Sequence, residues 1–246
     1  MKIGVFDSGI GGLTVLKEIM YKLPKFHYIY YGDTLHLPYG DKTKQELLEL
    51  VSKIIDFFIK EKVDLILIAC GTVSSTIYDE LCNLYSIKIL NIINSTIEKI
   101  ETDKIQDIVV LATTRTINSH VFSNSLENIK VTEIACPKFV PLLEKNIGNK
   151  DNILDEYLRA IKLDRKNNIV LGCTHYPLLQ KDIEKYLGYK VNFYNMGKII
   201  AEKITDLNLI NQDFMLEMYF SLIDDNLLNN VKRIIDVEYK IEQIVL

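Results

Sequence analysis

Two cysteines stand at corresponding places in the chain, each at the end of an apolar run and directly before small polar residues. Cys70 follows the run DLILIA and precedes Gly71-Thr72, while Cys173 follows NIVLG and precedes Thr174. A thiol placed where a strand gives way to a helix N-terminus is expected to have a lowered pKa and to be accessible as a base or nucleophile. Two such thiols suit a reaction in which one group removes a proton and another returns one.

Small and polar residues also gather at these strand ends and at two others. The N-terminus of a helix offers unpaired N–H groups that can bind a carboxylate, and side-chain hydroxyls add further donors. Each Ser or Thr alone is explained as a helix N-cap, but five of them beside two cysteines favour a polar binding site. Asp7 and His175 are placed to orient or tune the thiols. The hydroxyl residues are Ser8, Thr72, Thr113, Thr116 and Thr174.

The remaining cysteines and the glycine-rich turn have simpler interpretations. Cys82 and Cys136 are expected to be buried small hydrophobes, with Cys82 on the apolar side of a helix. The run Gly9-Ile10-Gly11-Gly12 lacks the Lys-Ser/Thr of a phosphate loop and the full GxGxxG spacing. A tight turn with close packing of helix on strand explains these glycines better.

The elements that position these residues alternate along the chain. Short apolar segments are predicted to be strands. Between them lie segments with the hydrophobic periodicity of a helix, such as Lys44–Lys60. This alternation predicts an α/β fold with parallel sheets covered on both faces. The expected strands are Ile3–Phe6, His27–Tyr31, Asp64–Ala69, Ile108–Ala112, Asn168–Gly172, Val191–Tyr194, Met215–Ser221 and Ile241–Val245.

A repeated sequence pattern divides the chain into two halves. The two strand-Cys-Thr segments predict two similar α/β lobes whose strand ends face a shared cleft, where open α/β sheets bind ligands. We expect the first lobe to comprise residues 1–95 with 208–246, and the second to comprise residues 96–207.

Composition excludes several classes of protein. The 246 residues carry a formal net charge of −4, with 48% hydrophobic and 25% charged residues, so no basic surface indicates nucleic acid. No apolar run approaches the ~20 residues of a membrane helix. Four dispersed cysteines without a CxxC pair indicate neither a disulfide framework nor a zinc site, and we expect no metal and a reducing, cytoplasmic location.

Several strings together resemble the glutamate racemases of the aspartate/glutamate racemase superfamily. The resemblance spans nearly the whole chain in family order, and DSGIGGL and GCTHYPLL are highly specific. The matching strings are Val5–Leu13, Tyr31–Thr34 with Pro38–Gly40, Ala69–Thr72, Thr113 with Thr116, Phe139–Glu144 and Leu171–Leu178.

The resemblance implies a role for each matching residue. Cys70 and Cys173 match the two catalytic cysteines, one on each face of the substrate α-carbon. Asp7 matches the residue that assists the first thiol, and His175 and Glu144 match those that assist the second. The family uses no pyridoxal phosphate or metal and supplies D-glutamate for peptidoglycan. The sequence leaves a homodimer open. Positions that match substrate-binding residues are Asp7, Ser8, Tyr39, Gly40, Gly71, Thr72, Thr113, Thr116, Thr174 and His175.

Three positions depart from the family pattern. Gly71 stands where the family has asparagine after the first cysteine, His36 replaces an arginine, and Asn195-Met196-Gly197 replaces a more acidic or hydroxylic pair before glycine. None of these removes a proton-transfer group, but Gly71 bears on substrate preference.

Three alternatives remain open. The first is a racemase for aspartate or another amino acid. The second is a weakened amino-acid-binding homologue. The third is a thiol hydrolase that uses one cysteine with His175, which leaves the other cysteine without a role.

Overall fold

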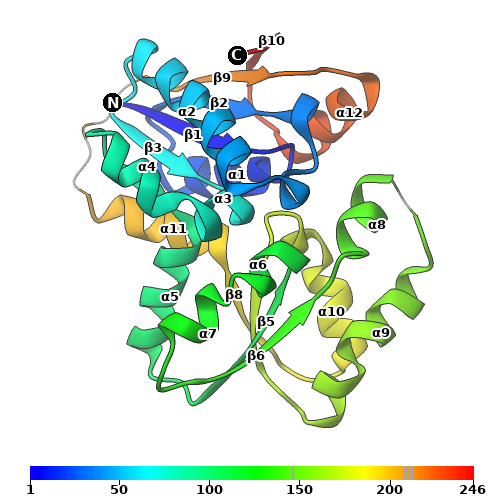
Figure 1. Ribbon diagram of the computed structural model, residues 1–246. Helices are drawn as coiled ribbons and strands as arrows, with labels where there is room; N and C mark the ends of the chain where they lie inside the picture. Colours follow the sequence, from blue (N-terminus) through cyan, green and yellow to red (C-terminus); the bar gives the residue numbers. More distant parts are fainter. Residues whose placement is uncertain (146, 208–209, 211–212) are drawn as a thin grey trace.

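The computed structural model describes residues 1–145, 147–207, 210 and 213–246, with the side chain of Lys145 excepted. The described strands form two separate parallel sheets, stacked as an upper and a lower lobe in Figure 1. The strands are β1 (Lys2–Asp7), β2 (His27–Gly32), β3 (Leu65–Ile68), β4 (Ile89–Asn91), β5 (Asp107–Ala112), β6 (Lys130–Ala135), β7 (Asn168–Gly172), β8 (Asn192–Asn195), β9 (Met215–Phe220) and β10 (Lys240–Gln243).

The helices fall between successive strands, as parallel pairing requires. Short 3-10 turns are η1 (Thr34–His36), η2 (Tyr39–Asp41) and η3 (Tyr176–Leu179). The α-helices are α1 (Gly12–Lys22), α2 (Lys44–Lys60), α3 (Gly71–Thr76), α4 (Tyr78–Leu84), α5 (Ile92–Asp103), α6 (Thr114–Asn118), α7 (Val121–Ser125), α8 (Phe139–Lys145), α9 (Lys150–Leu163), α10 (Gln180–Leu187), α11 (Met196–Thr205) and α12 (Asp225–Ile234).

The two sheets share one strand order. The first runs β10-β9-β2-β1-β3-β4 and the second runs β6-β5-β7-β8. Leaving out β9 and β10, which extend the first sheet beyond β2, both orders are second-first-third-fourth. Such a sheet reverses its winding between the first and third strands, and ligands bind beyond the carboxyl ends at that point. The expected α/β class with two similar parallel-sheet lobes is therefore confirmed.

Alternating side chains bury both faces of the first sheet. Ile3 and Val5 face α1 and α12, while Phe6 faces α2 on the other side. Helix α2 begins with a complete capping box, in which Thr43 and Glu46 satisfy each other's backbone N–H groups. Its apolar stripe then packs on the sheet, as the three- and four-residue spacing predicted.

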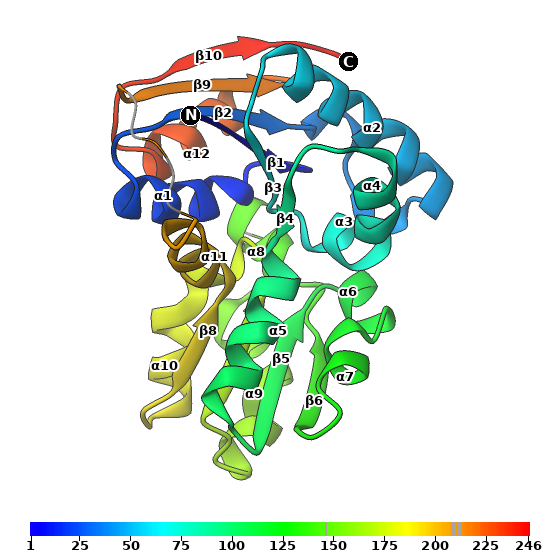
Figure 2. The same ribbon diagram turned by 90° about the vertical axis from the view of Figure 1, so that its left-hand side faces the viewer.

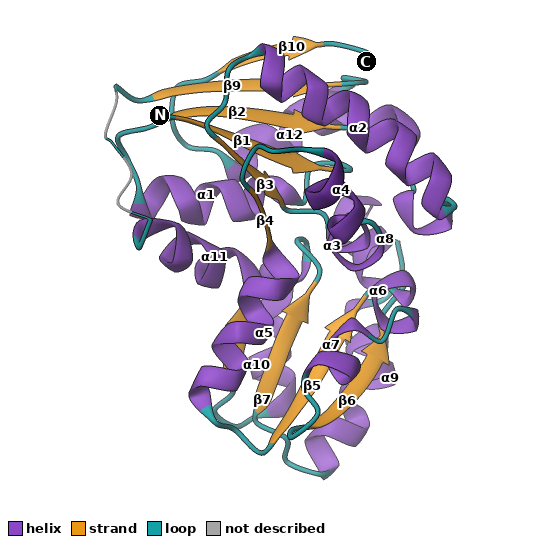
Figure 3. Cartoon of the chain, turned by 60° about the vertical axis from the view of Figure 1, so that its left-hand side comes forward, coloured by secondary structure: helices purple, strands orange, loops and turns teal. Residues whose placement is uncertain are grey.

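The second sheet is covered in the same way. Val109 and Leu111 face α8, α9 and α10, and Ile108 and Val110 face the helices at the junction of the lobes. Helices α1, α11 and α5 pack one against another at that junction (Figure 2). Figure 3 shows the strands of the second sheet running toward the first lobe, so their carboxyl ends meet it.

The structure corrects several sequence expectations. Strands β4 and β6 were missed, because β4 has only three residues and β6 (KVTEIA) is a half-exposed edge strand with a weak apolar signal. The last strand lies at Lys240–Gln243 rather than Ile241–Val245. Cys82 in α4 is exposed, not buried. No helix in the described part of the chain is long and apolar enough to cross a membrane.

We propose the lobe boundaries as expected from the sequence, 1–95 with 208–246 and 96–207. The sheet memberships support this division, because β1–β4, β9 and β10 form one sheet and β5–β8 the other. Residue 208, where the first lobe resumes in this proposal, lies outside the described residues.

Candidate functional site

The candidate catalytic and binding residues lie at the carboxyl ends of the central strands of each sheet. Asp7 ends β1 and Cys70 follows the neighbouring strand β3. In the second sheet Thr113 follows β5 and Cys173 follows its neighbour β7. These are the two points where the winding reverses, so the fold places a thiol at the ligand-binding edge of each sheet.

The first thiol is connected to Asp7 through a serine. Cys70 Sγ lies 3.5 Å from Ser8 Oγ, and Ser8 Oγ lies 3.3 Å from Asp7 Oδ1. Cys70 is only 4% exposed. Burial, together with the nearby Asp7 charge, raises the pKa of the Cys70 thiol to about 12. The lowered pKa expected at a helix start is therefore wrong for Cys70, which is a protonated thiol at neutral pH.

Asp7 is held by backbone donors on both carboxylate oxygens. The Ser8 N–H donates to Oδ1 at 2.7 Å, and the Gly12 N–H donates to Oδ2. A Cβ on Gly12 would lie 2.9 Å from both Asp7 Oδ2 and the Tyr30 hydroxyl, so only glycine allows α1 to start this close to β1. Burial raises the pKa of Asp7, against the opposing effects of the His175 charge and these N–H donors.

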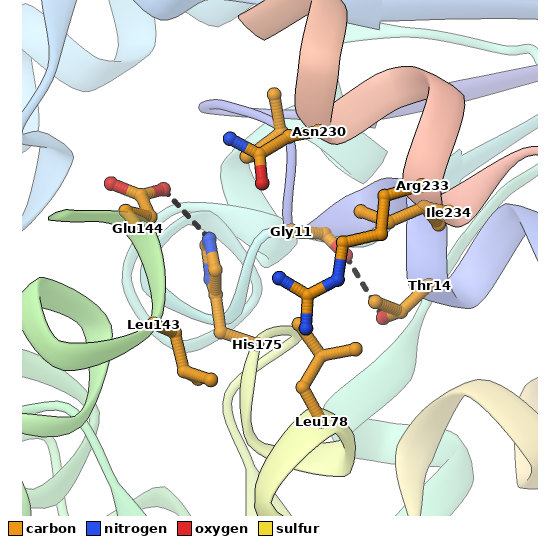
Figure 4. A pocket seen from close by; sticks show the side chains of 10 residues that line it. Gly11, Thr14, Leu143, Glu144, His175, Leu178, Asn230, Arg233 and Ile234 are labelled. Carbon is orange, nitrogen blue, oxygen red and sulfur yellow. Dashed lines mark hydrogen bonds and ion pairs between the residues drawn. The ribbon is translucent and has the colours of Figure 1, made fainter. Parts of the chain in front are cut away.

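The second thiol has a histidine and a glutamate as partners. Cys173 Sγ lies 3.8 Å from His175 Nδ1, and His175 Nε2 lies 2.8 Å from Glu144 Oε1, the contact dashed in Figure 4. Burial lowers the pKa of His175, but hydrogen bonds to Cys173 and Glu144 outweigh this and raise it to about 10. His175 is therefore cationic at neutral pH and stands beside Cys173, a residue that is only 9% exposed.

The two lobes meet through these same residues. The Thr174 hydroxyl donates to Asp7 Oδ2 at 3.3 Å, which links the Cys173 turn to the first lobe. Around Gly71, a Cβ would lie 3.5 Å from Thr116 Oγ1 and 3.6 Å from the Gly172 carbonyl. The turn that carries Cys70 thus faces the end of β7 and the helix α6 that follows β5.

The remaining predicted binding residues surround this junction. Thr113 caps α6, and its hydroxyl lies 3.1 Å from that of Thr116. Thr72 is buried in the first turn of α3. Tyr39 and Gly40 form η2, which packs against both α3 and α6. All ten residues predicted to bind substrate therefore lie on the elements that meet where the lobes face each other.

The Tyr39 hydroxyl is already engaged in a hydrogen bond within its own loop. It donates to Asp33 Oδ2 at 2.6 Å, and His36 Nδ1 lies 2.8 Å from Asp33 Oδ1. Asp33 therefore anchors the loop that carries η2. The sequence indicated His36 as a departure from the family but assigned no role to Asp33, although its place directly after a strand end was a usable signal.

Two features of this region differ from the sequence expectation. No α-helix starts directly after Cys173, because Thr174 and His175 form a turn, followed by η3 and then α10. Thr14 was not singled out, yet its hydroxyl bonds to the Thr174 carbonyl. In the described residues, no three His, Cys, Asp or Glu side chains come together to hold a metal ion.

The chain is similar to known proteins over most of its length. Residues 34–204 match the sequence model of the Asp/Glu/Hydantoin racemase family. The chain belongs to this family. One relative is the glutamate racemase from Hydrogenobaculum sp. (strain Y04AAS1). It is 35% identical to this chain over 251 residues, which cover 99% of this chain and 96% of the relative.

Two further relatives of this family member carry the same name. Glutamate racemase from Fusobacterium nucleatum subsp. nucleatum is 39% identical, covering 85% of this chain and 83% of that protein. The crystal structure of glutamate racemase from Francisella tularensis subsp. tularensis in complex with D-glutamate superposes with a TM-score of 0.86 at 27% identity, covering 99% of this chain and 97% of that one. This family member is thus an amino-acid racemase, an isomerase.

Proposed function

We propose that this protein interconverts L- and D-glutamate without a cofactor, with Cys70 and Cys173 acting on opposite faces of the substrate α-carbon. One observation carries the proposal. Two similarly ordered sheets each place a buried cysteine at their ligand-binding edge, and each cysteine has its own polar partners. The shared substrate class of the relatives supports glutamate as the substrate.

The protonation states of the two sites suit opposite tasks. Cys70, with its raised pKa, is a proton donor at neutral pH. We assign the proton-accepting role in the first direction to Cys173, because cationic His175 stands 3.8 Å from its Sγ. In the first direction Cys173 takes the α-proton, and Cys70 gives its proton to the opposite face of the carbanion. The product leaves a Cys70 thiolate and a Cys173 thiol, which are the states required for the reverse reaction.

The groups around the substrate would lower the free energy of the carbanion that forms when the α-proton is removed. An α-proton beside a carboxylate is very weakly acidic, so catalysis without an electron sink depends on fixed donors and exclusion of water. Hydroxyls and helix N–H groups would bind the α-carboxylate, the ammonium group and the side-chain carboxylate. The residues proposed for this are Ser8, Tyr39, Gly40, Gly71, Thr72, Thr113, Thr116 and Thr174, with Asp7 and His175 at the thiols.

We further propose that the product, D-glutamate, is used for peptidoglycan and that the enzyme acts in the cytoplasm. Both follow from the resemblance to glutamate racemases and from the reduced state that two working thiols need. The low exposure of both cysteines implies that the lobes separate to admit the substrate and close again for reaction.

Circular dichroism of each enantiomer of glutamate and of aspartate, incubated with the purified protein, tests this proposal. We expect the signal of either glutamate enantiomer to decay to zero, with aspartate much slower. Decay of aspartate alone would assign the protein to the alternative substrate. An unchanged signal in all four incubations would contradict the racemase proposal.

A further inference from the structure

A hydroxyl of the first lobe bonds directly to the backbone beside the second catalytic cysteine. Thr14 Oγ1, in the first turn of α1, lies 2.6 Å from the carbonyl oxygen of Thr174 and 2.9 Å from that of Gly11. Thr14 and Thr174 are 160 residues apart in sequence. A hydroxyl has one proton, and the shorter distance assigns its main donation to Thr174.

The start of α1 fits closely against the same turn. A Cβ on Gly11 would lie 2.5 Å from His175 Nδ1, and closer still to His175 Cε1 and Thr174 Oγ1. Gly11 has ordinary helical dihedral angles, so space and not backbone conformation requires glycine here. Figure 4 shows Gly11 and Thr14 on one side of the lobe junction and His175 on the other.

Thr174 is therefore fixed to the first lobe at two atoms. Its side-chain hydroxyl reaches Asp7 Oδ2, and its carbonyl accepts from Thr14. Thr174 is the residue between Cys173 and His175, so the orientation of its peptide groups sets the direction of both neighbouring side chains. Within the described part of the chain, the Thr14 hydroxyl bonds to two backbone carbonyls and to no catalytic side chain, so it acts through the backbone.

We propose that Thr14 is a positioning residue for the proposed racemisation, whose hydroxyl holds the Cys173–His175 turn in register with the first lobe when the lobes are closed. The inference rests on the proposed function. Loss of the hydroxyl leaves the Thr174 carbonyl without its donor and frees the turn to shift. A shift of about 1 Å at a reacting group is enough to slow chemistry by about a hundredfold.

The effect falls on one of the two proton transfers. Cys173 moves with the turn that Thr14 holds, whereas Cys70 is carried by α3 of the first lobe. The two enantiomers are equal in free energy, so kcat/KM has to fall equally in both directions. Isotope effects on the α-proton separate the steps, because they report how far removal of that proton limits each direction.

The experiment compares Thr14→Val with Thr14→Ser. Valine keeps the shape and removes the hydroxyl, while serine keeps the hydroxyl. Thr102→Val is the matched control, because Thr102 is exposed at the end of α5 and its hydroxyl donates only to the Glu98 carbonyl of the same helix. Each variant is assayed with L- and D-glutamate, with and without deuterium at the α-carbon, and its thermal unfolding is measured.

For Thr14→Val we expect kcat to fall about ten- to a hundredfold with KM changed less than about threefold. The α-deuterium isotope effect should rise in the direction in which Cys173 removes the proton and fall in the other. Thr14→Ser should recover most of the rate, and Thr102→Val should match the wild type. If valine destabilises the fold, Thr14→Ala, which removes the same hydroxyl from a smaller side chain, should give the same asymmetric isotope effects.

The outcomes that overturn the inference differ from those that overturn the function. Wild-type kcat in Thr14→Val, or equal changes of both isotope effects, would show that the hydroxyl does not position Cys173. A wild-type enzyme that racemises neither enantiomer would instead overturn the proposed function itself.

Discussion

The Thr174 hydroxyl of the second lobe lies 3.3 Å from the Asp7 carboxylate of the first. Asp7 belongs to the polar chain that reaches Cys70, and Thr174 is the immediate neighbour of Cys173. Beside the bond from Thr14 to the Thr174 carbonyl, this hydrogen bond connects the surroundings of the two thiols across the junction of the lobes. This bond makes Asp7 the residue on which both the local fold and the relation of the two thiols depend.

Asp7→Asn should damage both stability and activity. Each carboxylate oxygen accepts a backbone N–H, from Ser8 or from Gly12, so an amide in either orientation places its NH2 group against a donor. The expected loss of unfolding free energy is about 1–3 kcal/mol, measurable by chemical denaturation. Asp64→Asn is the control, because only one Asp64 oxygen accepts a backbone N–H, and an amide oxygen replaces it. Equal stability of the two variants would contradict this account.

Glu144→Gln should move the high-pH limit of activity. The pKa of His175, about 10, is raised above its ordinary value, so the cation persists through neutral pH and is lost as pH rises through that value. Without the Glu144 charge the pKa falls, and kcat/KM should begin to decline at a pH lower by about one unit or more. Glu156→Gln, which breaks only the exposed pair with Lys138, should keep the wild-type profile. An unchanged profile in Glu144→Gln would show that His175 does not need its charge.

Gly71→Asn should fold and raise activity toward glutamate. A Cβ at this position meets only ordinary contacts, at 3.5 Å from Thr116 Oγ1 and 3.6 Å from the Gly172 carbonyl. A new amide bonded to a charged ligand group contributes about 1.5–3 kcal/mol, or roughly ten- to a hundredfold in kcat/KM. Steady-state kinetics with glutamate and aspartate measures this. A folded variant with unchanged or lower glutamate activity would indicate a site rebuilt around glycine and would favour another substrate.

Activity should survive removal of any cofactor. Thiol, imidazole and carboxylate groups suffice for the proposed proton transfers, so dialysis against a chelator and treatment with hydroxylamine should leave kcat unchanged if a reductant protects the thiols. The same preparation is then assayed with added pyridoxal phosphate and with divalent metal ions. Recovery of activity only upon such addition would contradict cofactor independence.

The sequence predicted the parts of the site that depend on local pattern. Strand-end residues such as Asp7, Cys70 and Cys173 were recognisable because a buried parallel strand ends in a short polar turn, and that pattern is contiguous in the chain. The similarity of the two lobes was predicted from the repeated strand-Cys-Thr segment. The half-exposed strand β6 was not, since its alternation of apolar and polar residues is weak.

Features that depend on the relative placement of the lobes were not predictable. The bond from Thr14 to Thr174 joins residues 160 positions apart, and nothing in either local sequence encodes it. The raised pKa of Cys70 also depends on tertiary packing, because burial and the nearby Asp7 charge outweigh the effect of the short helix that follows it. The exposure of Cys82 likewise depends on which face of the seven-residue α4 packs against the first lobe.

Deuterium transfer during racemisation tests the two-thiol mechanism most directly. Each enantiomer of glutamate is incubated in deuterated water with wild type, Cys70→Ala, Cys173→Ala and the control Cys82→Ala, whose exposed thiol lies outside the site. We expect the wild type and control to place deuterium in the inverted product before it appears in recovered substrate, and each active-site variant to lose about a hundred- to ten-thousandfold or more in racemisation. Near wild-type racemisation by Cys70→Ala or Cys173→Ala, or early label in the unreacted enantiomer, would contradict the proposed pair of opposed thiols.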